Sequence, residues 1–155
     1  MVAFIDVKKL SSIDKVVVGA GAVGLIALFL PWLGYSSPDA SASQSGFGAG
    51  LGLLGALLIV ATAVYLGMQR SGAQMPRTSM GPGVITLGGS LVGTVLVILH
   101  WLSAPRASVA GGLVTYGPRY GMIIELLAGV VQALCALTLF RRSGEAVPWS
   151  RETSS

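Results

Sequence analysis

Apolar residues along this chain gather into four long runs, and short polar segments separate them. The first run, Val16 to Tyr35, contains no charged side chain. A run of this kind can cover the hydrocarbon core of a bilayer, which takes about 20 helical residues. The pattern therefore predicts an all-α fold, an integral membrane four-helix bundle. Its expected spans are residues 16–35, 47–68, 84–103 and 120–140.

Three segments follow from this division. Residues 1–15 form a basic N-terminal segment, residues 16–140 the four-span membrane domain, and residues 141–155 a polar tail. Ser11 and Asp14 have the spacing of a capping box just before the first span. The basic start followed by an apolar run also imitates a signal peptide. We favour an uncleaved span, because the apolar part of a signal peptide is usually about 7–15 residues long.

Positive charges sit at the ends of the runs and indicate an orientation. Three Lys precede the first span, two Arg (Arg70 and Arg77) lie between the second and third, and three Arg follow the fourth. The other two loops hold only Arg106 and Arg119. The positive-inside rule therefore predicts that both termini are cytoplasmic, in a multi-pass protein of the bacterial cytoplasmic (inner) membrane. We expect aromatic interface anchors on the opposite side: Trp32, Tyr35, Trp101 and Tyr120.

Composition excludes several other classes. The 155 residues are 53% hydrophobic and 10% charged, whereas soluble domains carry about 25% charged residues. The net charge is +4, but the basic residues form no stripe of the kind that binds nucleic acid, so no nucleic-acid partner is expected. The expected partner is the lipid bilayer. One Cys and one His cannot build a disulfide, a bis-histidine haem site or a His-rich metal site, so no cofactor and no metal are expected.

The first run also contains Gly19, Gly21 and Gly24 in the spacing GxGxxG. In nucleotide-binding folds this motif joins a strand to a helix whose N-terminus meets a pyrophosphate. The second strand and the acidic residue that should follow are absent from the pattern here. Small residues that let helices approach closely explain the glycines better. The expected helix-packing residues are Ala20, Gly24, Gly48, Gly52, Gly89 and Gly93.

Glu125 is the only acidic residue within a predicted span, where a charge costs roughly 2.5–3.5 kcal/mol. Helical spacing places His100 of the neighbouring span at a similar depth. The candidate ligand or proton-coupling residues are therefore His100, Glu125 and Gln132. Two interpretations stay open. The first is a protonatable His–Glu pair in an outward cavity. In the second, His100 lies in the headgroup zone beside Trp101, and Glu125 is bonded to His100, to Arg119 or to water. No catalytic set of nucleophile and base is visible, so no enzyme is predicted.

The chain resembles a family of small four-span membrane proteins of GC-rich bacteria with no assigned activity. The resemblance rests on Asp14-Lys15-Val-Val-Val-Gly-Ala-Gly and on Leu28-Phe29-Leu30-Pro31-Trp32, and it would cover Ser11 to Arg142. Many members carry an acid before the Phe-Leu-Pro-Trp element. Here that region reads Ile26-Ala27-Leu28, so a role for that acid cannot be transferred.

Three functional hypotheses follow. The first is a non-enzymatic accessory or scaffolding subunit of a larger membrane complex, in which small-residue faces pack against other membrane subunits or against a second copy. The second is a small oligomeric transporter or channel element that uses a His100–Glu125 pair. The third is a lipid-modifying enzyme with its site at the outer face.

Overall fold

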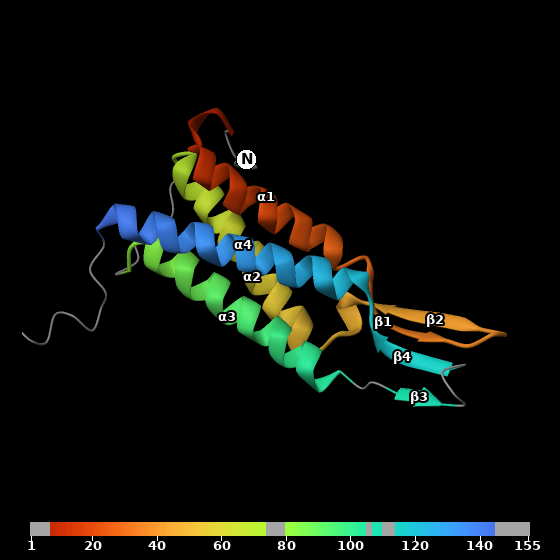
Figure 1. The fold of residues 1–155 in the computed structure, drawn as a ribbon. Helices are drawn as coiled ribbons and strands as arrows, with labels where there is room; N and C mark the ends of the chain where they lie inside the picture. The colour runs from red at the N-terminus through yellow and green to blue at the C-terminus, as the bar shows by residue number, and fades with distance from the viewer. Residues whose placement is uncertain (1–6, 74–79, 105–106, 110–113, 145–155) are drawn as a thin grey trace, which may run out of the picture.

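The computed structural model describes residues 7–73, 80–104, 107–109 and 114–144. Arg77, Arg106 and the tail 145–155, which entered the predictions above, lie outside the described residues. The described chain forms four α-helices that lie side by side, with a small sheet projecting from one end (Figure 1). The helices are α1 (Ser12–Ala27), α2 (Leu51–Arg70), α3 (Pro82–Ser103) and α4 (Tyr120–Ser143). Two 3-10 turns, η1 (Val7–Lys9) and η2 (Gly46–Gly48), precede α1 and α2.

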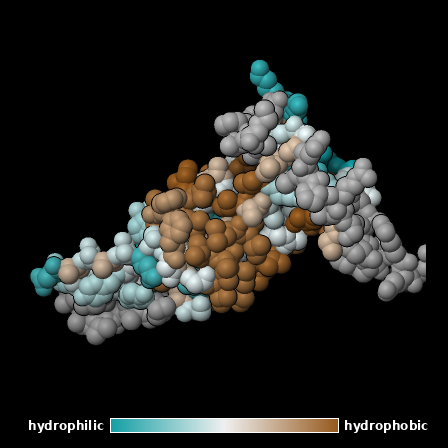
Figure 2. Space-filling view, turned by 180° about the vertical axis from the view of Figure 1, so that it is seen from behind, coloured by the Kyte–Doolittle hydropathy of each residue, from teal (hydrophilic) through white to brown (hydrophobic). Residues whose placement is uncertain are grey.

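Each helix packs against its neighbours in sequence, and α4 closes the bundle against α1. Three of the described helices, α2, α3 and α4, are long and apolar enough to cross a membrane. Large apolar side chains remain exposed on all four helices, and apolar residues cover the middle of the molecule in Figure 2. A soluble bundle would direct such side chains inward.

The first helix differs from the predicted span 16–35. It begins at Ser12 and ends at Ala27 after 16 residues, which is about 24 Å at the rise of an α-helix. Its start confirms the capping box, because Ser11 and Asp14 bond each other's backbone N–H. Its end precedes Pro31, which lacks an N–H and disfavours a helical residue before it. The three glycines of the GxGxxG spacing therefore lie within a helix, which removes the strand that a nucleotide site needs.

The prediction of an all-α fold is wrong at one end of the bundle. The end of the first predicted span, together with segments expected as loops, forms a four-stranded antiparallel sheet in the order β2-β1-β4-β3. Its strands are β1 (Pro31–Ser36), β2 (Ser41–Ser45), β3 (Ala107–Val109) and β4 (Val114–Pro118). The central pair β1–β4 joins residues that are far apart in sequence, such as Gly34 and Gly117. We call this the sheet end, and the opposite end, where α1 begins, the terminal end.

The side chain of Trp32, on β1, fills the sheet end of the bundle. It is fully buried, and its indole N–H donates a hydrogen bond of 2.8 Å to the carbonyl oxygen of Ala27. Gly46, Gly52 and Gly121 surround the ring, and a methyl group on any of them would lie within 3.0 Å of an indole atom. Glycines from three segments thus form the socket that admits this residue.

The terminal end is joined by an ion pair. The buried Asp14 of α1 lies 3.5 Å from the guanidinium of Arg70, the last residue of α2. The Arg70 side chain is 45% exposed, so the pair contributes little more than about 1 kcal/mol. It ties the start of α1 to the end of α2 at the level where the apolar surface stops.

Closely packed glycines hold the helices together between these two ends. A methyl group on Gly93 would lie 2.7 Å from the carbonyl oxygen of Gly55 across the α2–α3 contact. Gly129 of α4 similarly faces the Thr94 hydroxyl and Ile59. At Gly93 the neighbouring atom is backbone, and at Gly129 the neighbouring atoms are side chains, so an added methyl group would be crowded at both positions. Small residues serve this purpose in helix contacts within membranes.

This close approach can be tested with a matched pair of substitutions on α3. Gly93→Ala should lower the free energy of unfolding by about 1–3 kcal/mol, because the added methyl group meets backbone. Gly88→Ala, whose methyl group would have nothing within 4 Å, should be neutral or raise it by up to about 1 kcal/mol through helix propensity. Unfolding titrations of the purified protein in mixed detergent measure both. Equal effects of the two substitutions would contradict the packing.

Candidate functional site

Glu125 is an acidic side chain sealed inside the bundle. It lies on α4, is fully buried, and neither carboxylate oxygen has a hydrogen-bond partner among the described residues. Both oxygens face Gly24 of α1, where a methyl group would lie 3.1 Å and 3.2 Å from them. A carboxyl group without partners costs free energy in an apolar interior. Such a residue within a span is a functional candidate by default.

Gln132, two turns further along α4, is in contrast well bonded. Its amide nitrogen lies 2.8 Å from the carbonyl oxygen of Ile59, 2.9 Å from the Thr62 hydroxyl and 3.0 Å from the Ser90 hydroxyl. Two N–H groups serve these three acceptors. The amide oxygen faces α1 near Gly21 and has no partner among the described residues. Gln132 therefore links α4 to α2 and α3 and is a structural hub rather than a free ligand.

His100 does not pair with Glu125. The His100 ring packs against Gly52 of α2 and lies 6.2 Å from the Trp32 ring, measured between centroids. Its Nε2 has no hydrogen-bond partner among the described residues. Glu125 instead faces α1. The two side chains thus contact different helices, and the arrangement contains no His–Glu hydrogen bond that could relay a proton.

The predicted packing residues fall into three groups. Ala20 and Gly24 lie at the α1–α4 contact, and Gly52, Gly89 and Gly93 lie between α2 and α3, where Gly52 admits the His100 ring. Gly48 is different: it is exposed in η2 beside Gln44 and joins no two spanning helices. The second span was predicted to begin at residue 47, four residues before α2 begins at Leu51.

The expected interface anchors also divide. Tyr120 is 55% exposed, and Tyr35 and Trp101 are partly buried. Trp32 is fully buried in its glycine socket and cannot face lipid headgroups. The burial of Trp32 could not be predicted from sequence spacing, because Gly46, Gly52 and Gly121, which surround its ring, come from three separate segments.

Two features of the site were missed from the sequence. Thr62, an ordinary residue of an apolar run, accepts a hydrogen bond from Gln132 while its own hydroxyl donates to the carbonyl of Leu58 at 2.8 Å. Arg119 had been read as a loop charge. Its side chain lies across Gly34 of β1, and its backbone N–H donates to the Trp32 carbonyl at 2.7 Å. The described residues contain no cluster of three His, Cys, Asp or Glu that could hold a metal ion.

Comparisons with known proteins identify no family for this chain. No protein-family model, no curated protein and no solved structure matches the chain. The resemblance to small four-span proteins of GC-rich bacteria therefore stays a prediction. The functional argument rests on the geometry of this chain.

The contrast between the two buried polar residues of α4 gives a prediction. Glu125→Met should raise the free energy of unfolding by about 1–3 kcal/mol, because it removes an unpartnered polar group. Gln132→Met should lower it by about 1 kcal/mol, because interhelical hydrogen bonds are lost. Both are measured by unfolding titrations in mixed detergent. A Glu125→Met protein less stable than the parent would show that the carboxyl group makes a stabilising contact.

Proposed function

We propose that this chain is a non-enzymatic, multi-pass protein of the bacterial cytoplasmic membrane that serves as an accessory or scaffolding subunit of a larger membrane complex. The large apolar side chains exposed on all four helices, which we call the apolar belt, and the three long apolar helices support insertion into a bilayer. The short α1 would reach less far across the bilayer core, which is about 30 Å thick. The exposed Phe29 and the half-buried Leu30 that follow it extend the same apolar surface.

The charge distribution supports both termini being cytoplasmic. Among the described residues, six exposed Lys and Arg side chains lie at or beyond the terminal end, and the sheet end has only Arg119. The six are Lys8, Lys9, Lys15, Arg70, Arg141 and Arg142. The positive-inside rule then directs the terminal end to the cytoplasm and the sheet to the opposite side.

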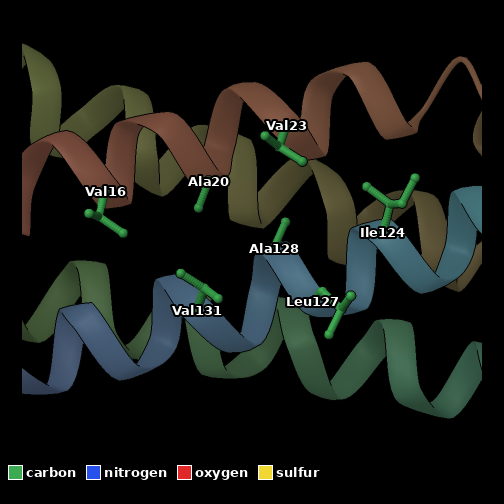
Figure 3. Close-up of a pocket in the computed structure, with 7 residues that line it drawn as sticks. All are labelled: Val16, Ala20, Val23, Ile124, Leu127, Ala128 and Val131. Carbon is green, nitrogen blue, oxygen red and sulfur yellow. The ribbon is translucent and has the colours of Figure 1, made fainter.

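An apolar groove between α1 and α4 carries the proposal of an accessory role. Its volume is about 340 Å³, and its lining consists only of aliphatic side chains from the two helices (Figure 3). Ala20 and Ala128 point toward one another and form its floor, while Val16, Val23 and Val131 stand at its edges. The groove lies on the outside of the bundle, within the apolar belt.

The shape of the groove favours one occupant, a transmembrane helix of a partner subunit. Its α1 side runs from Val16 to Val23, about 10 Å along the axis, which is two helical turns. A floor of alanines between valine edges is the pattern by which small residues let a second helix approach. The valine side chains are stiff at χ1, so the edges hold their shape.

A cross-linking experiment tests the partner helix. A photoreactive amino acid at Leu127, which borders the groove, should cross-link to one membrane protein in cells that express the chain. The same residue at Val95, on the exposed face of α3, should not. Val23→Trp should fill the groove and abolish the Leu127 cross-link, whereas Val95→Trp should leave it. Adducts to lipid alone would contradict the accessory role, and adducts to a second copy would replace the partner subunit by self-association.

Glu125 supports a second candidate function, a proton-responsive element within the membrane. Its carboxyl group has no hydrogen-bond partner within residues 7–73, 80–104, 107–109 and 114–144, and it lies beside Gly24 at the α1–α4 contact. Gly24 of α1 lies against both carboxylate oxygens, so separation of α1 from α4 would give a proton access to Glu125. A lipid-modifying enzyme has less support, because His100 and Glu125 face different helices.

A hydrophobic carbodiimide distinguishes this second function from a purely structural carboxyl group. The reagent enters from the bilayer and modifies protonated carboxyl groups in apolar surroundings. If α1 and α4 separate, Glu125 should be labelled in membranes, and mass spectrometry should find the adduct on the peptide that contains it. Glu125→Gln removes the adduct, and Asp14, held by Arg70, serves as the internal control. An unlabelled Glu125 would exclude proton exchange at this residue.

A further inference from the structure

A polar cavity lies where the sheet meets the helices. Its volume is about 360 Å³, and it is bordered by β1, β2 and the start of α4. The polar side chains that line it are one cation and five hydroxyl groups: Arg119, Ser36, Ser41, Ser43, Tyr35 and Tyr120. None of these was singled out from the sequence as a binding group, apart from the two tyrosines as interface anchors.

Strand register explains how the serines come together. Residues that pair across antiparallel strands point to the same face of a sheet. Ser36 pairs with Ser41, and Gly34 with Ser43, so these positions share one face. On the other side of β1, Gly34 pairs with Gly117, which adds no side chain to that face. The result is a flat surface of hydroxyl groups and bare backbone.

Arg119 extends over this surface. A side chain at Gly34 would collide with the Arg119 side chain, so the glycine is what allows the arginine to lie against β1. The backbone N–H of Arg119 is fixed by its bond to the Trp32 carbonyl, which positions the residue independently of its side chain. Among the described residues, no carboxylate lies within 4.0 Å of its guanidinium, since the one ion pair there joins Arg70 and Asp14.

An uncompensated guanidinium among hydroxyl donors favours an anion with several acceptor oxygens. Arginine bonds phosphate and carboxylate groups through its planar fork, with charge-assisted hydrogen bonds. The position of the cavity further limits the kind of anion that it would bind. Tyr120 is exposed beside it, and an exposed aromatic pair, Phe29 and Phe47, lies at the same end with ring centroids 5.0 Å apart. Tyrosines gather at the headgroup level of a bilayer, where phosphate esters are abundant.

We propose that the cavity formed by Arg119 and the serines of β1 and β2 binds the phosphate group of a membrane phospholipid. The inference rests on the proposed insertion of the bundle into a bilayer but not on the partner helix. Arg119 pairs with the phosphate oxygens, and the Ser41 and Ser43 hydroxyl groups donate further hydrogen bonds to the headgroup. The lipid fixes the sheet at the membrane surface.

Native mass spectrometry of the full chain in detergent tests this proposal. The probes are phosphatidylglycerol and diacylglycerol with the same acyl chains, of which only the first carries a phosphate. We expect phosphatidylglycerol to be retained and diacylglycerol to be lost. Arg119→Gln should weaken phosphatidylglycerol binding roughly tenfold, the usual effect of losing a charge-assisted bond. Arg142→Gln, at the opposite end, is the matched control and should leave binding unchanged.

Further measurements separate lipid binding at this site from loss of folding, from the partner helix and from binding of a soluble anion. The double substitution Ser41→Ala and Ser43→Ala changes two exposed residues and should weaken binding without altering the unfolding midpoint. Val23→Trp, which fills the α1–α4 groove, should leave lipid binding intact and so separates this site from the partner helix. Equal retention of both lipids, or equal binding by the Arg119→Gln protein, would overturn the proposal. Displacement of the lipid by millimolar inorganic phosphate would assign the site to a soluble anion instead.

Discussion

The burial of one indole ring determines how the sheet end of this protein is built. Trp32 ends the first helix by bonding the Ala27 carbonyl, and its own carbonyl receives the N–H of Arg119, the residue before α4. The ring can lie there only because Gly46, Gly52 and Gly121 leave room for it. The same residue therefore positions β1, the start of α4 and the backbone of Arg119. The sheet and its polar cavity depend on this arrangement.

Close glycine contacts impose a second constraint. They limit which buried polar residues can find hydrogen-bond partners. Where backbones touch, as at Gly55 and Gly93, the space between helices is too small to hydrate a buried group. Gln132 satisfies its N–H groups with hydroxyl and carbonyl oxygens of neighbouring helices. Glu125 finds no such partner in the part of the chain that the structure describes. A carboxyl group kept at that cost is better explained by a role than by stability.

The helices could be predicted from the sequence, because continuous apolar runs and flanking charges are local signals. The sheet could not. β1 lies inside an apolar run, β2 reads Ser-Ala-Ser-Gln-Ser with no strand-like alternation, and the pairing of β1 with β4 is distant in sequence. The candidate site was predicted only in part. Helical spacing predicted a similar depth for His100 and Glu125 but not the rotation of their helices, and this rotation places the two side chains against α2 and α1.

The α1–α4 contact brings the groove and the buried carboxyl group into one structural unit. Val23 lines the groove, and the next residue, Gly24, faces Glu125. Ile124, beside Glu125 in the chain, also lines the groove. A helix seated in the groove would therefore hold α1 and α4 together and restrict access to the carboxyl group. Because coupling between two sites is reciprocal, protonation that favoured separation of α1 from α4 would weaken partner binding by the same factor. Association and proton response would then be two consequences of one helix contact.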